Sequence, residues 1–94
     1  MRILIVEDED HIRQQLRTAM RRQNYAVDVA KDGREGLYFA TEYPYDLAII
    51  DLGLPEISGI TLIKELREND KKFPILILTA RGDWQDKVEG LEAG

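Results

Sequence analysis

The chain has 94 residues, of which 44% are hydrophobic and 33% charged, so it is a globular chain of one domain at most. It contains no Cys, which excludes a disulfide framework and a thiolate metal site. Its formal net charge of -5 argues against direct binding to nucleic acid, because contacts to phosphates require clustered Lys and Arg. No apolar run is long enough to cross a membrane and no signal peptide precedes the first strand, so we expect a cytoplasmic protein without a membrane partner.

Short apolar runs alternate with helical patterns along the chain. Strands are predicted at Arg2–Val6, Ala26–Ala30, Leu47–Asp51 and Ile75–Leu78. Helices are predicted at Asp10–Arg22, about Arg34–Glu42, about Ile60–Glu68 and about Trp84–Ala93. The periodicity predicts that the first helix packs through Ile12, Leu16, Ala19 and Met20, and the third through Leu62, Ile63 and Leu66. The basic stretch from Arg13 to Arg22 is expected to be a solvated face of the first helix.

The alternation of strands and helices predicts right-handed βαβ units, and therefore a doubly wound parallel sheet with helices on both faces. The strand order 2-1-3-4 fits best, because the second predicted strand is the most polar and suits an edge. In that order the connections reverse direction between the first and third strands. Ligands of such sheets bind beyond the carboxyl ends of the strands at that point.

Polar groups follow these strands at the predicted binding edge. Glu7 and Asp8 follow the first strand, Asp51 ends the third, and Thr79 follows the fourth. Crowded carboxylates raise one another's pKa unless a cation or protons intervene. Asp8, Asp51 and the Gly53 carbonyl offer the oxygen ligands that Mg²⁺ prefers, and a carboxylate can also attack phosphorus to form an aspartyl phosphate. The Thr79 hydroxyl could donate to a phosphate oxygen.

Three segments resemble the signature of response-regulator receiver domains, whose fold is flavodoxin-like (CheY-like). They are Val6-Glu7-Asp8-Glu9, Ile50-Asp51-Leu52-Gly53-Leu54-Pro55 with Gly59, and Leu78-Thr79-Ala80-Arg81. With the following run Trp84-Gln85-Asp86-Lys87-Val88, the last two segments are similar to the PhoP-type members of the OmpR/PhoP subfamily. The resemblance covers the chain from Met1 to Gly94. Gly53 and Gly59 are also compatible with a plain backbone requirement for positive φ.

The resemblance implies a role for each residue of the acidic edge. Asp51 would be the phosphoacceptor, loaded from the phosphohistidine of a sensor histidine kinase. Asp8, Asp51 and the Gly53 carbonyl would bind Mg²⁺, with Glu7 as the second residue of the acidic pocket. Thr79 would be the hydroxyl that switches towards the phosphate. Such a domain catalyses only its own phosphorylation and dephosphorylation, so we expect no enzyme acting on a separate substrate.

The chain departs from the receiver pattern at its end. Receivers continue with a fifth strand that ends in a Lys, and with a fifth helix, whereas this sequence stops at Gly94. We therefore expect a receiver domain over residues 1–94 that is incomplete at its C-terminus. The fourth strand would then be an open apolar edge, which favours a homodimer or other self-association. In a PhoP-type parent, DNA would be bound by a C-terminal output domain that is absent from this chain.

Two other functions fit parts of the pattern. A Mg²⁺-dependent phosphohydrolase could form the same aspartyl phosphate, but such enzymes commonly carry a second carboxylate two residues after the nucleophile, where this chain has Gly53. A flavodoxin-like interaction module that is never phosphorylated would keep the acidic pocket without using it. A dinucleotide site is disfavoured, because Glu7 to Asp10 stand where a Gly-rich phosphate loop would be required.

Overall fold

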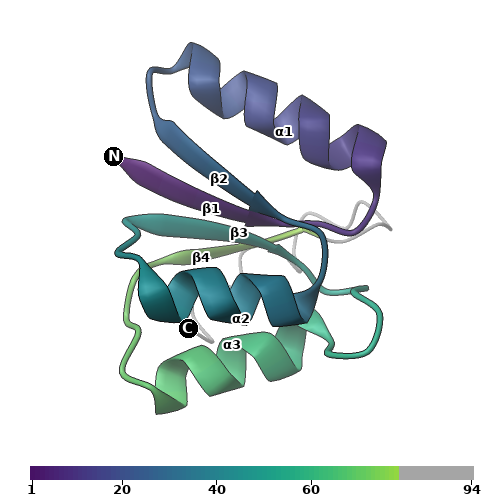
Figure 1. Cartoon of the computed structure of the whole chain (residues 1–94), viewed down its shortest axis with the longest axis vertical. Coiled ribbons are helices and arrows are strands. Elements are labelled where there is room, and N and C mark those ends of the chain that lie inside the picture. Colours follow the sequence, from purple (N-terminus) through teal and green to yellow (C-terminus); the bar gives the residue numbers. More distant parts are fainter. Residues whose placement is uncertain (79–94) are drawn as a thin grey trace.

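The computed structural model describes residues 1–78, which form a four-stranded parallel sheet flanked by three helices (Figure 1). The strands are β1 (Arg2–Val6), β2 (Ala26–Ala30), β3 (Leu47–Asp51) and β4 (Ile75–Leu78). The helices are α1 (Asp10–Arg22), α2 (Gly33–Glu42) and α3 (Gly59–Glu68). The strand order is β2-β1-β3-β4, which confirms the predicted topology. The predicted helix at Trp84–Ala93 lies outside the described residues.

Two of the helices begin one residue earlier than predicted, because side chains cap their first turns. The Asp32 side chain accepts a hydrogen bond from the Glu35 N–H, so α2 already begins at Gly33. In the same way, the Ser58 hydroxyl accepts from the Thr61 N–H at the start of α3. The bounds of the strands and of α1 agree with the prediction.

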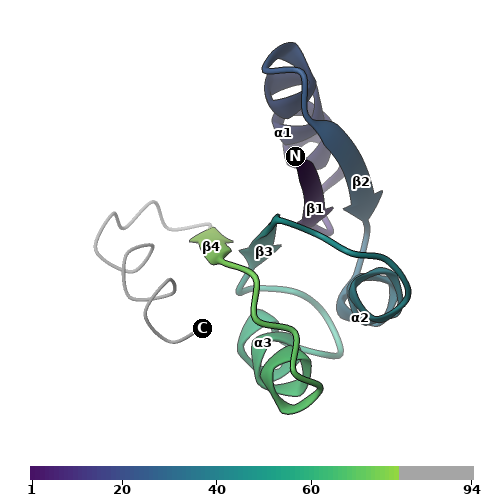
Figure 2. The same ribbon diagram turned by 90° about the vertical axis from the view of Figure 1, so that its left-hand side faces the viewer.

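The helices cover the two faces of the sheet unequally. Figure 2 shows α1 on one side of the sheet and α2 with α3 on the other. Successive strand residues point to opposite faces. Leu4, Val6 and Ile50 therefore lie in the main core with Leu62 of α3. Here the predicted packing residues of α3 are confirmed, since Leu62, Ile63 and Leu66 are all buried.

Residues 1–78 cover the face under α1 only in part. Among residues 1–78 it buries Ile3, Ile5 and Ile49, against which Leu16 and Met20 of α1 are packed but only half-buried. No residue of α1 is buried. The predicted packing role of Ala19 is wrong, because this residue is exposed. The physical reason is that α1 lies over β1 and β2 at one side of the sheet, so its contact face is narrower than its apolar stripe.

Helix α2 approaches β1 closely, and a glycine makes this possible. A Cβ added to Gly36 would lie 2.8 Å from Cγ2 of Val6, which is closer than side-chain carbons pack. The missing side chain thus brings the backbone of α2 onto the last residue of β1, just before the acidic segment begins. No helix within residues 1–78 is long and apolar enough to span a membrane.

Candidate functional site

The register of the sheet brings the ends of β1, β3 and β4 to one edge. Val6 is opposite Ile50, and Asp51 is opposite Leu78. The residues at this edge are acidic. One carboxylate oxygen each of Glu7, Asp8 and Asp51 lies within 4.8 Å of the others. The sequence had predicted that these carboxylates would meet, and within the described part of the chain they do.

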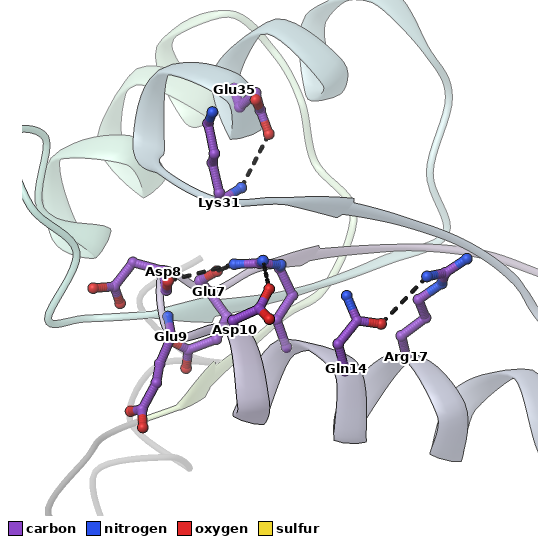
Figure 3. A network of polar contacts seen from close by, with 9 residues as sticks. Glu7, Asp8, Glu9, Asp10, Gln14, Arg17, Lys31 and Glu35 are labelled. Atoms are coloured by element: carbon purple, nitrogen blue, oxygen red, sulfur yellow. Dashed lines mark hydrogen bonds and ion pairs between the residues drawn. The ribbon is translucent and has the colours of Figure 1, made fainter.

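The three carboxylates differ in their exposure. Glu7 and Asp51 keep 3% and 7% of their surface exposed, whereas Asp8 is an exposed residue. Figure 3 shows Glu7 and Asp8 together with Glu9 and Asp10 at the end of α1 that faces this edge. The site therefore has a buried floor and a side that is open to solvent, through which a cation or a phosphoryl group can enter.

Backbone hydrogen bonds hold Glu7 in place. Its N–H donates to the Ala30 carbonyl at 3.0 Å, and its Oε2 accepts from the Glu9 N–H at 2.9 Å. Burial raises the pKa of Glu7 to about 7, and the nearby charge of Asp51 adds to this, while the Glu9 hydrogen bond acts in the opposite direction. Near neutral pH, Glu7 is thus partly protonated, and a bound cation could replace this proton.

The backbone around Asp51 is fixed from two sides. Oδ1 of Asp51 accepts from the Gly53 N–H at 3.1 Å, which sets the rotation of the carboxylate. The Leu52 N–H donates to the Leu78 carbonyl of β4 at 3.1 Å. Gly59 starts α3 directly against this turn, and a Cβ there would lie 2.8 Å from Cα of Leu52.

The close contact between Gly59 and Leu52 corrects the expectation that Gly53 and Gly59 serve a requirement for positive φ. Neither Gly53 nor Gly59 has a positive φ, so the left-handed conformation is not the reason for either. Gly59 is required because two segments of backbone touch there. Gly53 is exposed, and among residues 1–78 the one atom near an added Cβ is Oδ1 of Asp51, at 3.8 Å.

The donor set fits a hard divalent cation. Three carboxylates can supply oxygen ligands, and Mg²⁺ usually takes one or two carboxylates and keeps several waters. A cation would also offset the burial and the charge of Asp51 that raise the pKa of Glu7. The Gly53 carbonyl as a ligand stays a prediction. Thr79 lies outside the described residues, and its role as the switching hydroxyl also stays a prediction.

One residue of this region was misjudged from the sequence. Arg13 was assigned to a solvated basic face, but only 13% of its side chain is exposed. Its Nη1 donates to the carbonyl oxygens of Glu7 at 3.0 Å and Asp8 at 3.4 Å, and its Nη2 pairs with Asp10. The spacing of Asp10 and Arg13 by one helical turn was the available signal, since such residues share a helix face.

Comparison with known proteins places the chain in a family. Residues 3–94 match the family model of the response regulator receiver domain. The two-component response regulator PhoP of Pseudomonas aeruginosa is 58% identical over all 94 residues, and the transcriptional regulatory protein PhoP of Escherichia coli is 48% identical. The chain spans 42% of the length of each of these relatives.

Solved structures show the same fold. The receiver domain of Francisella response regulator 1452 is 33% identical with a TM-score of 0.87, over 99% of this chain and 77% of that one. Response regulator TrrA from Thermotoga maritima, solved in complex with Mg(2+)-BeF, is 36% identical with a TM-score of 0.82, over 93% and 76% of the two chains.

A third solved structure contains histidine kinase ThkA in complex with TrrA. Its matching chain is 37% identical to this one, with a TM-score of 0.81 over 89% of this chain and 72% of that chain. The sequence match, the strand order and the carboxylates at the sheet edge agree with one another. The chain therefore belongs to the response-regulator receiver domain family, and within it to the OmpR/PhoP type.

Proposed function

We propose that this receiver domain accepts a phosphoryl group on Asp51 from a sensor histidine kinase, in a reaction that requires Mg²⁺. The observation that carries the proposal is the position of Asp51: it is almost buried, it ends β3, and carboxylate oxygens of Glu7 and Asp8 lie within 4.8 Å. The complexes of TrrA with Mg(2+)-BeF and with histidine kinase ThkA support the metal and the partner.

The residues of the chain have separate tasks in this reaction. A carboxylate oxygen of Asp51 attacks phosphorus while the bond from phosphorus to the donor's imidazole nitrogen breaks, and that nitrogen keeps the electron pair. The Gly53 N–H holds Oδ1 and so presets the orientation of the nucleophile. Asp8 and Asp51 would hold Mg²⁺, which when bound neutralises charge on the phosphoryl oxygens.

We further propose that the domain acts on itself alone and is no enzyme for a separate substrate. The place two residues after Asp51, where phosphohydrolases of this chemistry commonly carry a second carboxylate, is Gly53. A captured phosphoryl group would therefore have no neighbouring general acid there. In the proposed cycle, Thr79 would donate to the captured phosphoryl group and pass the signal on.

The full-length protein is proposed to be a cytoplasmic transcription regulator. The PhoP relative from Escherichia coli is named a transcriptional regulatory protein, and this chain spans 42% of its length. Its remaining length leaves room for a DNA-binding output domain. A second copy of the chain is proposed as a further partner.

Intact mass after incubation with acetyl phosphate and Mg²⁺ tests the proposal. We expect one phosphoryl adduct, which is absent in Asp51→Asn and absent when a chelator removes the metal. An adduct that persists in Asp51→Asn would contradict the assignment of the nucleophile. Sustained release of phosphate from small esters would point to the phosphohydrolase instead, and a complete lack of adduct in the full-length protein would favour the interaction module.

A further inference from the structure

We propose that Arg13 is a positioning residue of the acidic site, which holds the backbone that presents Glu7 and Asp8 to a cation. The inference rests on the proposed function, because it concerns the same Mg²⁺ site. It is carried by a separate observation: Arg13 is bonded to three consecutive carbonyl groups of the segment that supplies two of the three carboxylates.

The contacts of Arg13 come from both its side chain and its backbone. Nη1 donates to the carbonyls of Glu7 and Asp8, at 3.0 and 3.4 Å. The backbone N–H of Arg13 donates to the carbonyl of Glu9 at 2.9 Å. The Arg13 side chain therefore fixes two consecutive peptide groups where the chain leaves β1, while the bond to Glu9 is the first backbone bond of the helix.

These bonds limit how the two carboxylates can move. The orientation of a carboxylate depends on the peptide groups on either side of its Cα atom. With its carbonyl fixed by Arg13 and its Oε2 held by the Glu9 N–H at 2.9 Å, Glu7 is constrained at both ends. Asp8 is exposed and has fewer constraints of its own, so the bond from Arg13 to its carbonyl matters more. Residues that orient metal ligands in this way commonly change metal affinity when they are replaced.

We expect Arg13 to strengthen Mg²⁺ binding by holding the backbone in place, and not through its positive charge. The guanidinium also pairs with Asp10, whose side chain is 80% exposed, so a carboxylate already offsets its charge before any cation binds. Arg13 itself is far more enclosed than other arginines of the domain that form ion pairs, with 13% of its side chain exposed against 39% for Arg2 and 76% for Arg34. The planar guanidinium is forked, so one terminal nitrogen donates to the two carbonyls while the other pairs with Asp10.

Calorimetric titration of the full-length regulator with Mg²⁺ tests the role. Arg13→Gln removes the charge and the fork, and Arg13→Lys keeps the charge but loses the fork. We expect both variants to bind Mg²⁺ about tenfold more weakly than the wild type. Arg17→Gln is the matched control. It removes the same charge one turn further along α1, where the Arg17 side chain bonds only to Gln14 among residues 1–78, and it should bind Mg²⁺ like the wild type.

Two further measurements separate positioning from a general loss of structure. The rate of phosphorylation by acetyl phosphate should reach the wild-type maximum at saturating Mg²⁺, with only the half-saturating concentration raised. In the metal-free protein, hydrogen exchange of the Glu9 amide should speed up in Arg13→Gln and stay unchanged in Arg17→Gln, because Glu7 no longer holds this amide as firmly.

The outcomes distinguish this inference from the proposed function. If the wild type takes up a phosphoryl group but both Arg13 variants bind Mg²⁺ within twofold of it, the positioning role is wrong. If Arg13→Lys bound Mg²⁺ as tightly as the wild type, the positive charge alone would be sufficient. That result would also contradict the positioning role. If the wild type neither binds Mg²⁺ nor takes up phosphoryl, the proposed function fails, and the Glu9 exchange measurement still decides whether Arg13 holds the segment.

Discussion

Burial and cation binding act in opposite directions on the carboxyl group of Glu7. Burial raises its pKa from 4.5 to about 7, so the folded protein binds this proton more tightly than the unfolded chain does. The contribution of Glu7 to stability is therefore fully present below the unfolded pKa and is lost as the pH rises through about 7. Affinity for Mg²⁺ should change the other way, because the cation requires the carboxylate without its proton.

Replacing Glu7 by Gln tests this pH dependence. At pH 8 without metal, Glu7→Gln should be more stable than the wild type by on the order of 1–3 kcal/mol, and the difference should shrink towards pH 5. Urea unfolding at both pH values measures it. Mg²⁺ should stabilise the wild type more strongly at pH 8 than at pH 6. A wild-type protein that is more stable than Glu7→Gln at pH 8 without metal would contradict the assigned pKa.

At the scale of elements, the start of α3 couples the helix to the turn that carries the nucleophile. A Cβ at Gly59 would lie 2.8 Å from Cα of Leu52, so in Gly59→Ala one of the two backbones must shift. We expect a loss of unfolding free energy of about 1–3 kcal/mol, the usual cost of overpacking. Because the shift displaces the residue after Asp51, phosphorylation by acetyl phosphate should also slow down.

A second glycine of the same loop provides the control for stability. Among residues 1–78, an added Cβ at Gly53 has its nearest neighbour, Oδ1 of Asp51, at 3.8 Å, which is an ordinary contact. Gly53→Ala should therefore unfold at nearly the wild-type urea concentration. Equal losses of stability in the two variants would show that any side chain in this loop is harmful, and the specific contact of Gly59 with the turn would then not be the cause.

At the opposite end of the sheet, a network of side chains links β1 and β2 to the segment that leads into β3. Asp28 of β2 accepts from the Tyr45 hydroxyl at 2.7 Å and from Nη2 of Arg2 at 2.8 Å. Burial raises the pKa of Asp28, but the hydrogen bonds from Tyr45 and Arg2 outweigh it, and the net pKa is lowered. Asp28 thus adds stability above its unfolded pKa of about 3.9, and this is lost as the pH falls through its folded pKa.

Removing the hydroxyl of Tyr45 should weaken this network. Tyr45→Phe leaves Asp28 with one donor fewer, so we expect a loss of about 1 kcal/mol at pH 7 and a smaller loss at pH 3. Urea unfolding at the two pH values measures both. Tyr43→Phe is the control, since Tyr43 is exposed and Asp28 accepts from Tyr45 instead. A loss that is the same at pH 3 as at pH 7 would contradict the role of the ionised carboxylate.

At the scale of the whole molecule, the sequence predicted the sheet well because its signals are local and strong. The run Ile3-Leu4-Ile5-Val6 is apolar without a break, as a strand covered on both faces should be, and all of these residues are buried. The polar residues that end such runs predicted where the carboxylates meet. The strand order was predicted from the polarity of the second strand, which suits an edge, and β2 does lie at an edge of the sheet.

What the sequence could not predict depends on distances between elements. Periodicity showed which face of α1 is apolar, but not how far the sheet extends beneath it, so Ala19 was wrongly placed in the interface. Charge pattern suggested a solvated Arg13, although the guanidinium reaches back to carbonyls before the helix. Gly59 was explained by backbone conformation, whereas a contact with Leu52 decides it. Each of these errors concerns which atoms of another segment lie next to the residue, and a pattern along the sequence does not contain that information.

The unequal coverage of the two sheet faces leads to a last prediction. Leu62 is fully buried in the core between the sheet, α2 and α3, whereas Leu16 of α1 is only half-buried above Ile5 and its neighbours. In the 94-residue chain, Leu62→Ala should lower the free energy of unfolding by about 3 kcal/mol, because it leaves a cavity, and Leu16→Ala by about 1 kcal/mol. The same residue type is removed from a helix in both cases, so the difference reports the packing of the two faces. Urea unfolding measures it, and an equal loss would mean that the face under α1 is as fully covered as the other.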